Sequence, residues 1–145
     1  MANEPLPAKD VLTEFSSQWV SNNVTTPNFT EVTGAGEPLR LDLNVADQVV
    51  GKVGSPAIEE QPIGNYKYGN RTYNVDLEVY TLDSRQRLYN LVQEIRRIVH
   101  ARMHNLTNFQ RMRFMNFNEL TQEQVNVWAG TVTIQLENRA ILLET

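Results

Sequence analysis

The segment Tyr73–Met103, YNVDLEVYTLDSRQRLYNLVQEIRRIVHARM, holds the two clearest periodic patterns in the sequence. Apolar and polar side chains alternate from its start to Val79, which predicts a half-buried strand. Beyond this strand, apolar residues recur every three or four positions and predict an amphipathic helix over about 84–104. Asp83 stands before this helix and Gln86 follows three residues later, so we expect the two to form a capping box. The predicted fold is built around this strand and this helix.

Weaker patterns surround them. An apolar stripe that includes Phe15 and Trp19 predicts a short helix over 8–21. Gly69-Asn70 suits the turn of a two-residue hairpin within 66–71. Further strands are predicted over 39–45, 109–117 and 125–136, and loops over 22–37 and 46–65, with 48–53 read either as loop or as a continuation of the first of these strands.

Strands on both sides of one long helix predict an α+β fold. We expect a mixed, mainly antiparallel sheet, with the long amphipathic helix packed on one face and the short N-terminal helix beside it. The chain has 145 residues, which predicts a single domain over 1–145. The stretch 46–65 is expected to be an extended loop of this domain.

The composition excludes several classes of protein. There is no cysteine, so disulfide scaffolds, zinc ribbons and thiol nucleophiles are excluded. No apolar run approaches the ~18 residues of a transmembrane helix, and the first residues lack the pattern of a secretory signal. The formal net charge of −4 argues against a generic basic nucleic-acid binder. We therefore expect no membrane partner, and a protein of the cytoplasm or of a particle assembled there.

The charge is distributed unevenly along the chain. Residues 1–84 hold five basic and twelve acidic residues, residues 85–113 hold seven arginines and one glutamate, and residues 114–145 hold one basic and four acidic residues. The three segments carry net charges of −7, +6 and −3. Such asymmetry is a clue to a partner surface.

Three interpretations of the arginine-rich segment 85–113 remain open. The arginines could contact nucleic-acid phosphates, form an assembly surface that pairs with acidic segments of a neighbouring subunit, or belong to an ordinary solvated helix face. The acidic remainder of the chain favours the assembly surface, because it can supply complementary charge. The candidate subunit-interface residues are Arg85, Arg87, Arg96, Arg97, Arg102, Arg111, Arg113, Glu59 and Glu60.

No motif indicates catalysis, a cofactor or a metal. His100 and His104 share a helix face, but Ala101 stands where a zinc protease has its glutamate, and no third ligand is evident. Asp76 and Glu78 share the polar face of the predicted strand, where solvated carboxylates are the ordinary interpretation. We expect a protein that is not an enzyme.

The span from about residue 66 to residue 136 resembles small neck and tail-completion proteins of tailed phages, in particular the tail terminator family. The resemblance rests on the order of the elements and on the general pattern of their sequences, and it covers roughly two thirds of the chain. The segments that carry it are YNVDLEVYTLD, SRQRLYNLVQEIRRIVHARM, FQRMRFMNF and VNVWAGTVTIQLENRAI, together with AKDVLTEFSSQWV near the N-terminus.

This resemblance implies a non-enzymatic virion protein that assembles in the host cytoplasm into a homo-oligomeric ring, commonly a hexamer. Such a ring ends the growth of the tail tube and joins the tail to the head connector. Its partners would be the tail-tube protein and the connector protein, and genomic DNA would pass through the bore without specific binding. The stretch 46–65 departs from the family, since it is longer than compact members need. The alternatives are a head-closure, connector or tail-tube protein of the same virion, and, in another class, a small nucleic-acid-binding accessory protein that uses 85–113.

Overall fold

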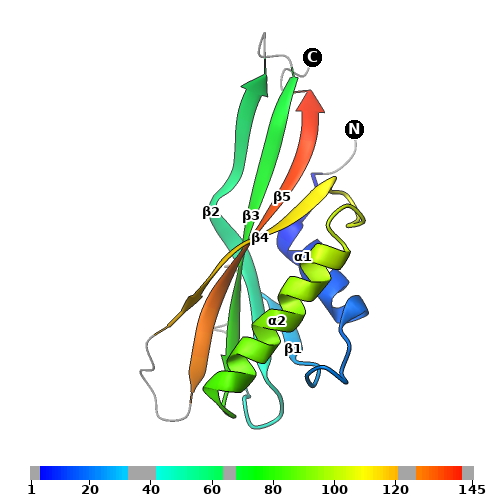
Figure 1. Cartoon of the computed structure of the whole chain (residues 1–145). Coiled ribbons are helices and arrows are strands. Elements are labelled where there is room, and N and C mark those ends of the chain that lie inside the picture. The colour runs from blue at the N-terminus through cyan, green and yellow to red at the C-terminus, as the bar shows by residue number, and fades with distance from the viewer. Residues whose placement is uncertain (1–3, 33–41, 64–67, 121–126, 142–145) are drawn as a thin grey trace.

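Two helices and five strands make up the parts of the chain that the computed structural model describes, namely residues 4–32, 42–63, 68–120 and 127–141 (Figure 1). The strands form one sheet in the order β1-β2-β3-β5-β4. β1 is parallel to β2, and the other neighbours are antiparallel. The elements are α1 (Pro7–Gln18), β1 (Asn28–Glu31), β2 (Gln48–Ile63), β3 (Tyr68–Thr81), α2 (Arg85–Ala101), β4 (Arg111–Glu119) and β5 (Trp128–Ile141).

Both helices pack on one face of this sheet and enclose a single apolar core. α2 turns one side inward, and its apolar residues from Leu88 to Val99 are buried. They pack against alternate residues of the two central strands, such as Val75 in β3 and Ile134 in β5. The α+β class, the mixed and mainly antiparallel sheet and the long helix on one face are therefore confirmed.

The N-cap of the long helix lies one residue later than predicted. Ser84 is the N-cap, and its hydroxyl oxygen accepts a hydrogen bond of 3.1 Å from the backbone N–H of Arg87. The capping box predicted for Asp83 and Gln86 is wrong, because a serine one residue further on takes the same role.

The chain between α1 and β2 contains a strand that the sequence pattern did not indicate. α1 ends at Gln18, and the indole N–H of Trp19 donates to the carbonyl oxygen of Val24 at 2.8 Å. The chain then forms β1, so the predicted loop over 22–37 is wrong for Asn28–Glu31. Four residues are too few to show a period, and β1 exists through its pairing with β2.

The region before and within β2 departs furthest from the prediction. The predicted strand over 39–45 is a turn from residue 42 onward, and residues 39–41 lie outside the described residues. The backbone N–H of Val45 donates to the carbonyl oxygen of Asp42. The predicted loop over 46–65 is wrong for Gln48–Ile63, which forms the sixteen-residue strand β2. The alternative interpretation of 48–53 as strand is confirmed, although it does not continue a strand over 39–45.

The hairpin between β2 and β3 was predicted with its turn in the wrong place. Gly69 and Asn70 lie within β3, where they pair with Pro62 and Gln61. Because Ile63 pairs with Tyr68, the connection falls on residues 64–67, which lie outside the described residues. Gly-Asn signals a turn only where the neighbouring strand does not already pair with it.

The last two strands are close to their predicted positions. The strand predicted over 109–117 is Arg111–Glu119, and the one predicted over 125–136 is Trp128–Ile141, with residues 125–126 outside the described residues. An aromatic ring explains why β5 has a glycine at position 130, since a Cβ there would lie 2.2 Å from Cε1 of Phe117. The register shift lies away from Gly130, which pairs with Glu119; it falls in β4 between Phe114 and Asn116, opposite Ile134 and Thr133.

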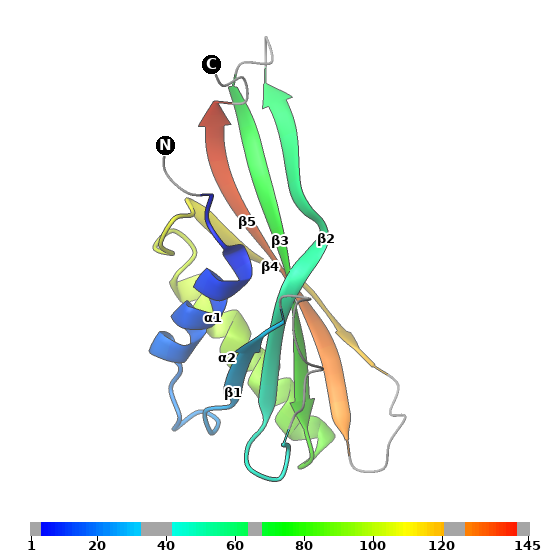
Figure 2. The ribbon, with the colours of Figure 1, turned by 180° about the vertical axis from the view of Figure 1, so that it is seen from behind.

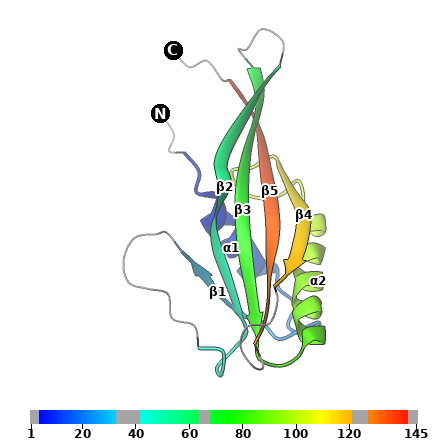
Figure 3. The same ribbon diagram turned by 90° about the vertical axis from the view of Figure 1, so that its left-hand side faces the viewer.

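Three of the strands continue beyond the helices as an arm. The arm consists of Ile58–Ile63 in β2, Tyr68–Tyr73 in β3 and Leu136–Ile141 in β5, paired in continuous register. Figures 1 and 2 show these strands rising past both helices, and Figure 3 shows β1 and β4 at the two sides of the sheet. We call the sheet face that is opposite the helices the open face. The arm and the open face carry surfaces that are described next.

Candidate assembly surfaces

Most of the arginines proposed as interface residues bind carboxylates of the same chain. Within the described residues, ion pairs are recorded for Arg85, Arg87, Arg97, Arg102, Arg111 and Arg113. The seventh, Arg96, is exposed on α2 and has no recorded ion pair among these residues. The seven arginines therefore spread over several surfaces and do not form one patch.

The first turns of α2 use two arginines to bind other parts of the fold. Arg85 donates to both carboxylate oxygens of Glu119 in β4, at 2.8 and 3.0 Å. Tyr89 donates to the same carboxylate at 2.7 Å. These hydrogen bonds, that from Arg85 above all, lower the pKa of Glu119. Arg87 donates to Asp47, just before β2, at 2.7 Å.

Further along α2, a buried carboxylate joins the two helices. The Glu94 side chain is 3 % exposed and receives two hydrogen bonds of 2.7 Å from Arg97. The backbone N–H of Val20 and the amide of Asn23 also donate to it, at 2.9 and 3.0 Å. The Arg97 guanidinium is the main cause that lowers the pKa of Glu94 to about 2, against the opposing effect of burial. Arg97 and Glu94 therefore hold the end of α1 in place.

The two arginines of β4 share one carboxylate at longer distance. Glu137 of β5 lies 4.0 Å from Arg111 Nη1 and 3.8 Å from Arg113 Nη1. Arg111 Nε is the one buried side-chain polar atom among the described residues that has no hydrogen-bond partner. This end of the sheet therefore carries an excess of positive charge and an unused donor.

The acidic candidates lie at the opposite side of the sheet, on β2. Glu60 binds Arg71 of β3 at 2.9 Å. Glu59 is exposed, and no ion pair is recorded for it among the described residues. Glu59 pairs in register with Thr72 and therefore points to the open face, whereas Glu60 is on the helix face.

Both sides of the sheet have outer edges that no described strand covers completely. β1 pairs with β2 only from Gln48 to Gly51, and the N–H of Val32 donates to the Gly51 carbonyl oxygen. In β4, the N–H of Met112 donates to the carbonyl oxygen of Met103. Beyond Gly51 in β2 and beyond Met112 in β4, no strand among the described residues pairs with the outer edge. Such edges are sites where another chain can add a strand.

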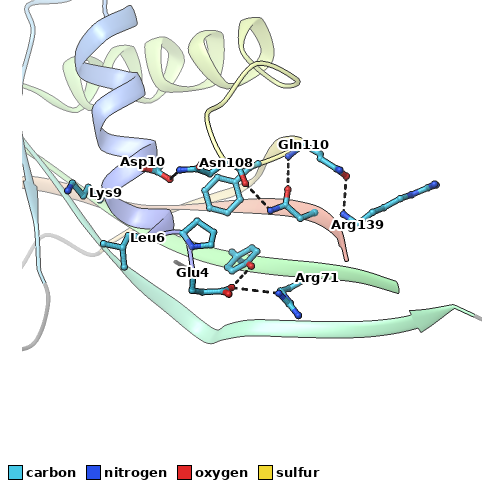
Figure 4. Close-up of a pocket in the computed structure, with 12 residues that line it drawn as sticks. Glu4, Leu6, Lys9, Asp10, Arg71, Asn108, Gln110 and Arg139 are labelled. Atoms are coloured by element: carbon cyan, nitrogen blue, oxygen red, sulfur yellow. Dashed lines mark hydrogen bonds and ion pairs between the residues drawn. The ribbon is translucent and has the colours of Figure 1, made fainter. Parts of the chain in front are cut away.

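A groove of about 830 Å³ lies where the arm joins the body, between the start of α1 and β5 (Figure 4). The hydroxyl of Tyr73 donates to Glu4 at 2.6 Å, and the amide of Asn138 donates to the carbonyl oxygen of Asn108 at 2.9 Å. Gln110 accepts from the backbone N–H of Arg139 at 2.9 Å. These hydrogen bonds lie within the chain and stabilise the junction between the arm and the body. The groove therefore presents few unused polar groups to a ligand.

The carboxylates considered for acid-base chemistry have structural partners, whereas His100 and His104 are exposed. Asp76 accepts a hydrogen bond from Thr133, while Glu78 binds Lys52 and Tyr80. Burial and the Glu78 carboxylate raise the pKa of Tyr80 to about 12. Within the described ranges, no group of three or more His, Cys, Asp or Glu residues could hold a metal ion. In the same ranges, neither helix has the length and apolar character needed to span a bilayer.

Sequence reasoning did not find the free edges of β2 and β4, because an edge is defined only once strands have partners. In the arm, residues 58–62 of β2 are exposed on both faces, which also hides β2 from pattern analysis. The one available signal was the length of 46–65, since structureless segments of that size are uncommon in small domains.

Comparison with known proteins supports the fold and leaves the family open. No protein-family model matches the chain, and no curated protein matches it. Among the solved structures it resembles is a chain of a structure described as "Virion of native gene transfer agent (GTA) particle". The match covers 90 % of this chain and 92 % of that chain, with 9 % identity and a TM-score of 0.58. At that identity the likeness shows the fold alone, so this chain has a fold that also occurs in a component of a virion particle.

Proposed function

We propose that this protein is a non-enzymatic structural component of a phage-like virion, and specifically a tail terminator. In this role a homo-oligomeric ring, with a hexamer as the expected form, closes the head-proximal end of the tail tube and joins it to the head connector. DNA passes through the bore without specific contacts. The observation that carries the proposal is the structural likeness, over 90 % of this chain, to a chain of a gene transfer agent virion.

The surface chemistry supports a role in assembly. Most of the arginines that could bind DNA phosphates form ion pairs with carboxylates of the same chain, such as Arg85 with Glu119 and Arg87 with Asp47. Within the described residues the sheet has uncovered edges on both of its sides, and a heterologous contact between different patches can close into a ring. The subunit interface is proposed to involve the arginine candidates of α2 and β4 together with Glu59 and Glu60.

Native mass spectrometry and negative-stain imaging of the purified protein test this role. We expect closed rings that do not elongate with rising protein concentration, and that bind one end of isolated tail tubes. Long tubes formed by the protein alone would identify a tube subunit instead. Binding to the connector without binding to tubes would favour a head-closure protein. A strict monomer that binds neither would overturn the proposal.

A further inference from the structure

The two free sheet edges of one chain are complementary to each other. We propose that the outer edge of β2, from Lys52 to Ile63, is a strand-addition site whose occupant is β4 of a second copy of this chain. This inference rests on the self-assembly in the proposed function and identifies the strands that would join.

The strand directions fit this pairing. β2, β3, β5 and β4 alternate in direction across the sheet, so β2 and β4 are antiparallel to each other. A second copy in the same orientation, placed beside β2 with its β4 first, therefore continues the antiparallel order. Each copy uses one edge to receive a strand and the other to supply one, which is the head-to-tail arrangement that closes into rings.

The free part of β2 begins at Lys52, below the arm, and continues through the arm, where it lies above the level of most of β4. β1 occupies the β2 edge as far as Gly51, and the register places Ile58 level with Leu136 in β5. The free part of β4 begins after Met112, and it runs from that level toward Gly130. The register places Val53 level with Phe114, so the two free edges overlap even without an offset, and a small offset between neighbouring copies lengthens the overlap. Strands of a closed sheet tilt by about 35–45° and are staggered in register, which supplies such an offset.

The charges at the two edges are also complementary. Glu59 on the β2 edge has no recorded ion pair among the described residues, while Arg111 and Arg113 on β4 share the single carboxylate of Glu137. Glu59 pairs with Thr72, and Arg111 pairs with Glu137, so these side chains all lie on the open face. The register places Glu59 level with Arg111, so pairing of β2 with a second copy's β4 at no more than a small offset brings the unmatched carboxylate to the shared arginines. It also offers an acceptor to Arg111 Nε.

Apolar side chains on the helix face would be covered by the same contact. Val53 and Ile58 are 53 % and 46 % exposed, although they pair in register with the buried residues Val75 and Tyr73. On β4, Met115 at the register shift is 45 % exposed. A strand added beside β2 removes Val53 and Ile58 from water, which is favourable for association.

Cysteine cross-linking tests the pairing directly, because the chain has no cysteine of its own. Lys52 and Glu59 lie on the open face of β2, and Arg113 and Asn116 lie on the open face of β4. The register places Lys52 level with Asn116 and Glu59 close to the level of Arg113, so we expect that, under oxidation, Lys52→Cys combined with Asn116→Cys, or Glu59→Cys combined with Arg113→Cys, gives a covalent ladder up to the ring. The single variants should give no ladder, and neither should the control that combines Asn116→Cys with Gln93→Cys on the exposed side of α2.

A charge exchange provides a second, independent test. Glu59→Lys and Arg113→Glu should each weaken self-association by about tenfold, since like charges across an interface are unfavourable. The double variant should regain most of the loss. Circular dichroism of each variant checks that the fold is retained.

The outcomes separate this inference from the proposed function. Wild-type rings without any cross-linked ladder, or charge variants that assemble normally, would overturn the β2–β4 pairing and leave the proposed function in place. A wild-type protein that stays monomeric at all concentrations would overturn both.

Discussion

At the residue scale, Glu94 carries the contact between α2 and the end of α1. Its carboxylate is buried and receives hydrogen bonds from Arg97, Val20 and Asn23. Removing this carboxylate leaves the N–H of Val20 and the amide of Asn23 without their acceptor, and a buried donor without a partner costs about 1–3 kcal/mol. We expect Glu94→Ala to lower the free energy of unfolding by roughly 2 kcal/mol in urea titrations at pH 7. The exposed Asp83→Ala should change it by less than about 0.5 kcal/mol, and equal effects would contradict this role.

The same carboxylate makes stability depend on pH in a defined direction. The pKa of Glu94 is lowered to about 2 from its ordinary value of 4.5, so the folded protein favours the charged form. This stabilisation is complete above pH 4.5 and is lost as the pH falls toward 2. The difference in unfolding free energy between wild type and Glu94→Gln should therefore shrink between pH 5 and pH 3. A difference that stays constant over this interval would show that ionisation of Glu94 does not contribute.

Gly130 is required by the ring of Phe117. A Cβ at this position would lie 2.2 and 2.5 Å from two ring carbons and 3.0 Å from the carbonyl oxygen of Asn118. Because overpacking costs typically about 1–3 kcal/mol, Gly130→Ala should lower the unfolding free energy by that amount. In the Phe117→Leu background the loss should be smaller, and a double-mutant cycle measures this coupling. Additive effects would indicate that the two side chains do not compete for the same space.

At the element scale, the start of α2 distinguishes two capping residues. The hydroxyl of Ser84 accepts a hydrogen bond from Arg87 N–H, and the N–H of Asp83 instead donates to Thr81. We expect Ser84→Ala to lower the unfolding free energy by about 1 kcal/mol. Asp83→Ala is the matched control and should have a smaller effect. The reverse order would restore the capping box predicted from the sequence.

Sequence patterns predicted the elements that bury one face. α2 and β3 present apolar residues at regular spacing because each packs against the core on one side only. β2 could not be predicted in this way. Its residues 58–62 in the arm are exposed on both faces, and its pairing shifts register between Val53 and Ile58, so no period survives. β1 depends on contacts with β2 that lie about twenty residues away along the chain.

The candidate site, too, could be predicted from the sequence only in part. The arginine-rich segment was visible as a run of charge, but the acids that bind it come from distant parts of the chain. Asp47 meets Arg87, Glu14 meets Arg102, and Glu119 meets Arg85. Such partners are brought together by the fold, and no spacing rule predicts them. The edge residue Glu59 was identified from its charge, whereas its place on an outer edge that no described strand covers became apparent only from the register.

At the scale of the whole molecule, the three charge segments of the sequence largely neutralise each other within the fold. The formal net charge is −4, and six of the seven arginines of 85–113 take part in recorded ion pairs. The field around a folded copy is therefore weaker than the −7, +6 and −3 pattern indicates. Local exceptions among the described residues include Arg96, the β2 edge with Glu59 and the β4 edge with two arginines on one carboxylate. This arrangement favours contacts between copies over contacts with a polyanion.

This charge balance predicts that the protein does not bind DNA. We expect the wild-type protein to show no measurable binding to a duplex of any sequence at about 0.15 M salt, because surplus guanidinium groups are needed to release counterions. Fluorescence anisotropy at decreasing salt concentration measures this. Glu119→Gln provides the matched comparison, since it releases Arg85 from its carboxylate and should increase binding at low salt. Tight wild-type binding that weakens steeply with salt would instead support the nucleic-acid-binding alternative, since that dependence requires several guanidinium groups to contact phosphates at once.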